Sequence, residues 1–249
     1  MSGTKCGTAK RPGEGAPGAG ELPLRTTTIS RNFRRDEGAP ADGSGVKTVP
    51  MQEHQPIEKL YHLAEFANLG SILEHGLLST ARILELAGLP KTQRTRMLRD
   101  HRPQCVRLAN GIIIRDQAPM PPSALAAALE NDLTPGDWYG LLNRHVFLWP
   151  DLDRMQRHRK ACKDRPQALL TFDAVALLRD FRDAAFVSPI NSGNARRKPA
   201  RRGTNTFVPY ALWSRHGFPT GQAKRLPAEL VFSTDVPVRK PYLLEIDRI

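Results

Sequence analysis

The sequence predicts an α+β protein whose folded part follows a long polar tail. Short apolar or β-branched runs alternate with segments of helical periodicity, and capping or turn residues bound most of them. Residues 1–52 are rich in Gly, Pro, Ala, Thr and Arg and have little apolar periodicity. We therefore expect a disordered, basic tail at 1–52 and one folded domain at 53–249. The expected strands are residues 60–63, 111–114, 145–149, 167–172, 184–187, 228–232 and 242–246.

Composition and charge narrow the partners that the protein can have. The chain of 249 residues carries a formal net charge of +12, which favours an anionic partner, most often nucleic acid. No run approaches the roughly 18 apolar residues that span a bilayer, and no apolar block follows the early basic residues. The three cysteines form no CxxC pair, which argues against a disulfide framework or a structural zinc site. We expect a cytoplasmic monomer with no bound metal and no membrane partner.

The folded domain is expected to begin with a short strand followed by one amphipathic helix. The strand 60–63 ends beside a helix whose apolar residues recur at helical spacing, and Asn68 is the expected N-cap. Gly76 is expected to end this helix in a left-handed conformation. His62 then lies next to a helix N-terminus, which is a natural position for an anion. The alternative is an ordinary core or surface histidine.

Further helices are predicted from their capping residues. Thr80 is placed to cap a second helix that ends near 88–90, and residues 91–102 form a strongly basic helical stretch. Most of its arginines are expected on a solvated face, although one could point inward at a bound phosphate. The segment 134–137 is an acidic variant of the capping box. Three more helices are expected to begin at Ser123, Asp151 and Asp173.

A basic segment follows the loop at 188–194. Residues 195–205 carry the densest positive charge of the folded part. Two interpretations are open: a mobile solvated loop, or an electrostatic contact with a phosphate backbone whose affinity falls steeply with salt. The second makes candidate nucleic-acid contacts of Arg196, Arg197, Lys198, Arg201 and Arg202.

Glu229 is a lone carboxylate in an otherwise apolar strand. By alternation it shares one face with Val231, so it points either to solvent or into a cleft. Exposure is the usual state of a glutamate. The strand at 242–246 is expected to form a last pair with this one, with residues 235–237 as the turn region between them.

Two stretches at the ends of the domain resemble DarT-like ADP-ribosyltransferases. The first is YHLAEFANLGSILEHGLLS, at residues 61–79, and the second is AELVFSTDVP, at residues 228–237. The middle of the chain is similar to an uncharacterised bacterial family through residues 137–149 and the segment SPINSG at 188–193. The usual Y-V-P-F-Y-F segment of the DarT-like proteins is absent, and Ala64 stands where a threonine is usual.

The resemblance implies a split, mixed β-sheet flanked by helices, with NAD in a cleft of that sheet. Glu229 then occupies the position of the catalytic glutamate, and an arginine after the first helices is the second catalytic group. Arg99 is the preferred candidate for it, with Arg96 and Arg102 as rivals. His62 would hold the nicotinamide ribose and amide region, and the neighbouring contacts expected for NAD are Leu63, Ser71 and Ser79.

Other polar residues stand at the ends of predicted elements, where groups that line a cleft tend to lie. They are Asn143, Arg144, Asn191 and Ser192, the first three of which are further candidates to contact NAD. The expected function is an NAD-dependent ADP-ribosyltransferase that acts on nucleic acid, with an antitoxin as a possible partner. The alternatives are a non-catalytic nucleic-acid-binding module, an NAD-using RNA phosphotransferase, and a regulatory protein whose basic loop docks a partner.

Overall fold

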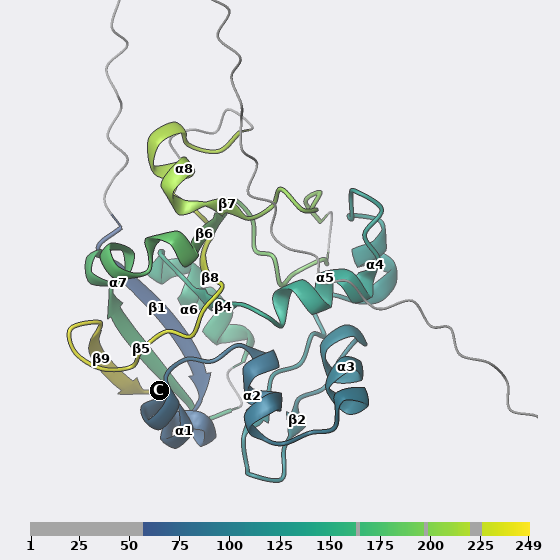
Figure 1. Cartoon of the computed structure of the whole chain (residues 1–249), viewed down its shortest axis with the longest axis horizontal. Coiled ribbons are helices and arrows are strands. Elements are labelled where there is room, and N and C mark those ends of the chain that lie inside the picture. The colour runs from purple at the N-terminus through teal and green to yellow at the C-terminus, as the bar shows by residue number, and fades with distance from the viewer. Residues whose placement is uncertain (1–56, 163–164, 197–198, 220–225) are drawn as a thin grey trace, which may run out of the picture. The chain divides into compact units, whose positions relative to one another are not determined.

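A computed structural model describes residues 57–162, 165–196, 199–219 and 226–249, and within them the predicted mixture of helices and strands is confirmed (Figure 1). The tail predicted at residues 1–52 lies outside the described residues. All the strand pairs within the sheets are antiparallel.

The first sheet has three strands in the order β1-β5-β9, namely β1 (Lys59–Glu65), β5 (Gln167–Asp173) and β9 (Leu243–Arg248). β5 is central, and its first six residues are buried, as expected for a strand covered on both faces. In the β1–β5 pair, Tyr61 lies opposite Thr171 and Glu65 opposite Gln167.

The second sheet has the order β4-β8-β6-β7. Its strands are β4 (Val146–Leu148), β8 (Glu229–Phe232), β6 (Ala185–Ser188) and β7 (Val208–Pro209). The expectation that the last two strands form a pair is wrong, because β8 lies in this sheet and β9 lies in the first. The segment after β8 instead forms a bridge between Val236 and Leu77.

The two sheets meet where β4 passes β1. The backbone groups of Tyr61 and Trp149 donate to each other at 2.9 and 2.8 Å. At the next position of this ladder, the Nδ1 of His62 donates to the carbonyl oxygen of Phe147 at 2.9 Å. A side-chain hydrogen bond thus follows the backbone pair at the junction of the two sheets.

A short hairpin of β2 (Val106–Arg107) and β3 (Ile113–Ile114) packs beside the first helix. The expected N-cap, Asn68, has helical dihedral angles and caps nothing with its side chain. Its amide instead donates to the carbonyl of Ile113 and accepts from the N–H of the same residue, at 2.9 and 2.8 Å. A two-way bond to a strand backbone, which periodicity cannot reveal, replaces the predicted cap.

Eight α-helices are described: α1 (Leu69–His75), α2 (Thr80–Leu86), α3 (Lys91–Arg99), α4 (Pro122–Ala126), α5 (Pro135–Leu142), α6 (Leu152–Ala161), α7 (Ala174–Asp180) and α8 (Tyr210–His216). Two short 3₁₀ turns, Phe66–Asn68 and Arg182–Ala184, precede α1 and β6.

The helix caps are confirmed in part. The capping box of Thr134 and Asp137 is present, and Asp151 and Asp173 cap α6 and α7 through their side chains. The cap of α2 is Ser79 and not Thr80, and α4 begins one residue before Ser123, after Pro121. Gly76 ends α1 with the expected positive φ, 86°.

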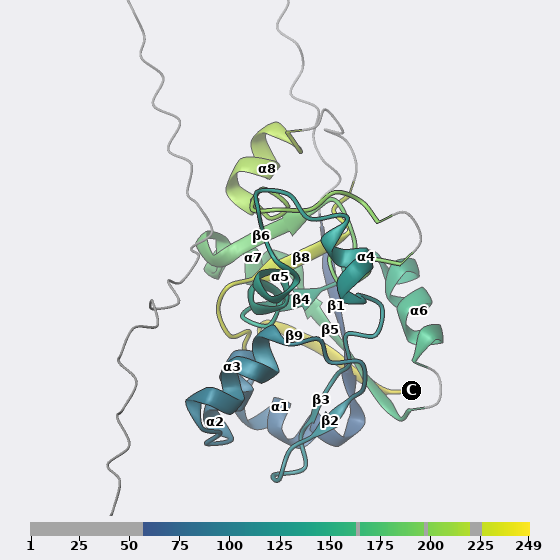
Figure 2. The same ribbon diagram turned by 90° about the vertical axis from the view of Figure 1, so that its right-hand side faces the viewer.

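One large apolar cluster joins the two sheets. It contains Leu60 and Phe172 from the first sheet, Leu230 and Phe232 from the second, and Leu177 from α7. A smaller cluster lies on the other face of β1, where Leu63 packs against Met155 of α6. Figure 2 shows α6 and the pair α2 and α3 on opposite sides of β1. Each helix of the described residues is too short or too polar to cross a lipid bilayer.

Candidate active site

Glu229 begins β8 and is buried, with only 4% of its surface exposed. The backbone N–H of Ser192 lies 3.1 and 3.2 Å from the two carboxylate oxygens. Burial raises the pKa of Glu229 to about 7, although this N–H and the charges of Arg202 and Arg154 act in the opposite direction. A carboxyl with a pKa near neutral can both accept and release a proton under ordinary conditions.

Ser192 belongs to a loop that is held in place by a buried arginine. Its carbonyl accepts from Arg202 at 3.0 Å and from the indole of Trp138 at 3.3 Å. The other nitrogens of Arg202 donate to the carbonyls of Ala200 and Asn194, and its guanidinium lies 5.9 Å from the Trp138 ring centre. Arg202 therefore positions the loop that covers Glu229, and its guanidinium is inside the protein.

Glu229 lies in one row with two aromatic residues. Trp149 pairs with Tyr61, and extending the β4–β8 register by one residue places Trp149 opposite Glu229. Directly opposed residues point to the same face of a sheet. That face is covered by α6, because the Trp149 ring lies 5.5 Å from the ring of His158. With strands roughly 4.8 Å apart, the backbones of Tyr61 and Glu229 are separated by about 10 Å.

His62 lies at the junction between the sheets but not beside Glu229. β4 stands between the strands that carry the two residues, and alternation places His62 on the face opposite to the neighbouring Tyr61. Burial lowers the pKa of His62 to about 4, assisted by the positive charge of Arg115. The ring is therefore neutral and serves the Phe147 carbonyl as a donor.

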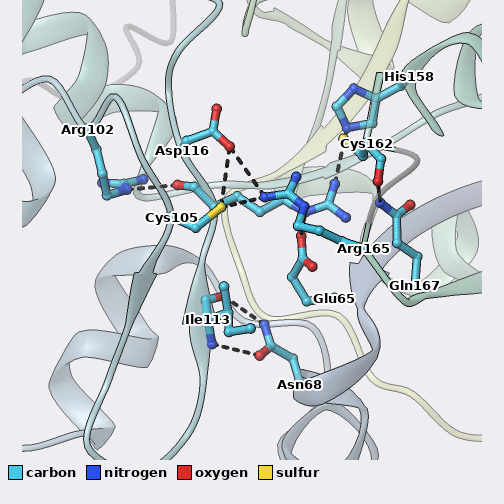
Figure 3. A network of polar contacts seen from close by, with 11 residues as sticks. Glu65, Asn68, Arg102, Cys105, Ile113, Asp116, His158, Cys162, Arg165 and Gln167 are labelled. Carbon is cyan, nitrogen blue, oxygen red and sulfur yellow. Dashed lines mark hydrogen bonds and ion pairs between the residues drawn. The ribbon is translucent and has the colours of Figure 1, made fainter. Parts of the chain in front are cut away.

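A second group of charged residues lies beyond this junction, with Glu65 buried and its partners partly exposed (Figure 3). Glu65, at the end of β1, is 3% exposed and accepts from the Nε of Arg115 at 2.8 Å. The Nε of Arg165 lies 3.5 Å from the same carboxylate. Arg115 also contacts the Nε2 of His158 at 3.2 Å, which requires that nitrogen to accept. Burial and Arg115 lower the pKa of His158 to about 4, which keeps it neutral.

The network continues to a cysteine and an aspartate. Asp116 lies 3.4 Å from the Sγ of Cys105 and 3.5 Å from Arg165, which also contacts that sulfur. Arg115 was not predicted as a functional residue, nor were its partners. The sequence carries no clear signal for Glu65, because β1 also contains Lys59 and His62 and the predicted strand ended at residue 63.

The three candidate arginines of the basic helix have partners other than Glu229. Arg99 donates to Asp137 at 2.6 Å and keeps about a third of its side chain exposed. Arg96 is exposed and lies 3.8 Å from Asp100. Arg102 is buried, and its guanidinium donates to the carbonyls of Met97 and Arg115 and to the side chain of Asn143.

The remaining residues predicted to contact NAD are dispersed over the fold. Leu63 is buried against α6, Ser71 lies half-buried in α1, and Ser79 caps α2. Asn143 joins Arg102 to the carbonyl of Leu98.

Two further candidates make local contacts. Arg144 donates to Gly140 within its own helix turn, and Asn191 accepts from the N–H of Gly193. Ser192, in contrast, is brought directly to Glu229.

The basic segment is described only in part. Arg197 and Lys198 lie outside the described residues. Arg196 is exposed and donates to the carbonyl of Ala118 at 3.0 Å, and Arg201 is exposed and donates to Glu130 at 3.1 Å. In the described part of the chain, no group of three or more His, Cys, Asp or Glu side chains is placed to hold a metal ion.

Residues 58–243 match a protein family described as a family of unknown function (DUF7002). No curated protein and no solved structure matches the chain. The arrangement around Glu229 must therefore be interpreted from its own chemistry.

Proposed function

We propose that this chain, which belongs to the DUF7002 family of unknown function, is an NAD-dependent ADP-ribosyltransferase that acts on nucleic acid. The observation that carries the proposal is Glu229, a buried carboxyl at the start of a central strand whose pKa is raised to about 7. The resemblance of the end segments to DarT-like enzymes supplies the reaction class. We further propose that the two sheets joined at Tyr61 and Trp149 correspond to the split sheet of those enzymes.

The chemistry of the reaction suits a carboxylate in this position. The bond between the ribose C1′ and nicotinamide breaks, nicotinamide leaves, and a bond forms from C1′ to a nucleophilic atom of the acceptor. The ribose passes through an oxocarbenium-like state, as in glycoside hydrolysis. The Glu229 carboxylate would stabilise this positive charge and take the proton that the acceptor loses.

The surrounding residues divide the remaining tasks. Ser192 holds the carboxylate by its N–H, and Arg202 holds Ser192. Arg99 stays the predicted anion clamp, since about a third of its side chain is exposed and guanidinium groups match diphosphate oxygens. His62 is fixed on the Phe147 carbonyl and faces the side of the sheet opposite to Glu229, so the proposal assigns it no contact with the nicotinamide ribose.

The test is incubation of the protein with labelled NAD and, separately, single-stranded DNA, duplex DNA, RNA and lysate protein. We expect label on one nucleic acid and free nicotinamide in equal amount. Glu229→Gln is expected to abolish both while keeping the far-UV circular dichroism spectrum. The matched control is Glu245→Gln, which changes an exposed glutamate of β9. NAD turnover by Glu229→Gln at the wild-type rate would remove the assignment.

A non-catalytic nucleic-acid-binding module is the second candidate. The burial of Glu229, which is only 4% exposed, favours this alternative. So do the exposed side chains of Arg196 and Arg201 on a chain of net charge +12. This function predicts binding that weakens steeply with salt and no consumption of NAD. Arg201→Gln is expected to lower the salt slope under this alternative.

A further inference from the structure

A pocket opens next to the row that contains Glu229. Its volume is about 230 Å³, and its lining combines residues from β1, from the start of α6 and from the segment before β8. These residues are Ile57, Glu58, Lys59, Tyr61, Pro150, Leu152 and Leu226. Tyr61 connects the pocket to the row, because it pairs with Trp149, the residue opposite Glu229.

The lining of the pocket mixes polar and apolar groups, and two of its apolar residues remain open to solvent. Leu152 and Leu226 are 42% and 37% exposed, which makes them two of the large hydrophobic residues left uncovered in the described chain. Tyr61 and Pro150 add an aromatic ring and a pyrrolidine ring. Such rings are suited to a flat ligand, because a planar group can bury both of its faces against them.

Two charged residues, Glu58 and Lys59, are among those that line the pocket. Both are exposed. A carboxylate accepts hydrogen bonds and an ammonium group donates them. A heteroaromatic ring with neighbouring donor and acceptor atoms on its edge matches this arrangement, whereas a simple hydrocarbon would leave both groups unused.

From this lining we propose that the pocket binds a nucleobase. The ligand class rests on the proposed function, in which both NAD and the acceptor contain bases, and either one could supply the base. Tyr61 would stack on it, the two leucines would cover its faces, and Glu58 and Lys59 would contact its edge. The pocket is tied to the site through Tyr61, whose backbone lies about 10 Å from that of Glu229, two strand spacings away.

The experiment measures equilibrium binding and not turnover. Dissociation constants are determined for NAD, for a short single-stranded oligonucleotide, and for the same strand without bases. Stacking on one aromatic residue contributes roughly tenfold or more in affinity per base. In the wild type we expect NAD, or the strand with bases over the strand without them, to gain at least about this factor.

Tyr61→Leu and Leu152→Ser are expected to remove most of that gain. Leu212→Ser is the matched control, because Leu212 is 43% exposed on α8 and does not line the pocket. Loss for NAD alone assigns the cofactor base, and loss for the oligonucleotide alone assigns the acceptor base. If the variants bind both ligands as the wild type does, the proposal is refuted. Leu152 is already exposed, so its variant is readable even if Tyr61→Leu does not fold.

The outcome is independent of catalysis. A protein that transfers no label can still show base-dependent binding that Leu152→Ser weakens, which would support the pocket and reject the enzyme. An active protein whose binding is unchanged by both substitutions would retain the enzyme and reject the pocket.

Discussion

Replacing Glu229 by glutamine tests whether ionisation of this buried carboxyl lowers the free energy of unfolding. Burial raises the pKa of Glu229 from 4.5 to about 7, so the folded protein binds this proton more tightly than the unfolded chain does. The corresponding contribution to stability is fully present below pH 4.5 and is lost as the pH rises through 7. At about 1.4 kcal/mol per pKa unit, the loss amounts to about 3 kcal/mol.

Glutamine keeps an oxygen that can accept from the Ser192 N–H but carries no charge at any pH. The free energy of unfolding of Glu229→Gln should therefore exceed that of the wild type by about 1 kcal/mol at pH 5 and about 3 kcal/mol at pH 8. The measurement is urea unfolding at both pH values, followed by tryptophan fluorescence.

Glu245→Gln is the control for general effects of charge, since Glu245 is exposed on β9. Its difference from the wild type should be the same at both pH values. A constant difference for Glu229→Gln as well would refute the reasoning, because it would mean that the carboxyl titrates alike in the folded and unfolded states.

Three further predictions concern the frame around this site. Gly76→Ala should lower the free energy of unfolding by about 1–3 kcal/mol in urea, because its φ is positive and a Cβ would lie 2.7 Å from the Val236 oxygen. Glu65→Gln should cost about 1–2 kcal/mol in the same assay at pH 7, since it leaves Arg115 without its carboxylate, and the 25% exposure of Arg115 reduces the penalty expected for a fully buried charge. His158, whose pKa is lowered to about 4, contributes stability that is present above pH 6.5 and lost as the pH falls through 4; His158→Gln should therefore flatten the acid limb of a melting-temperature profile.

The elements that the sequence predicted correctly have local causes. The capping box at Thr134 and Asp137, and the caps Asp151 and Asp173, depend on atoms three residues apart, so the sequence contains them completely. α8 was not predicted, because it lacks such a cap. It follows Pro209, and no side chain caps its first turn.

The errors concern partners that are distant in the sequence. Asn68 has the residue type of an N-cap, but a strand 45 residues away offers its amide two bonds at once. β8 and β9 follow each other in the chain and yet join different sheets, because β5 already offers β9 an antiparallel edge. Strand neighbours depend on which edges are free, and periodicity holds no information about that.

Among the residues predicted for the site, the structure brings Ser192 to Glu229 and gives most of the others separate partners. Glu229 was singled out by the resemblance of its segment to DarT-like enzymes; as a lone carboxylate it was expected to be exposed, and it is instead buried at the start of β8. Arg202 was assigned to a phosphate backbone because it stands in a basic run. The structure gives it three backbone carbonyls instead, a use that the charge pattern cannot distinguish from a solvated arginine.

Two buried glutamates, one at the end of β1 and one at the start of β8, have different surroundings in this fold. Glu65 faces the guanidinium groups of Arg115 and Arg165. Glu229 receives a single backbone N–H, from Ser192, and its pKa is raised. For Glu229, burial outweighs the hydrogen bond from Ser192 and the charges of Arg202 and Arg154, and its pKa rises to about 7. This raised pKa is what makes Glu229 the candidate for a general base.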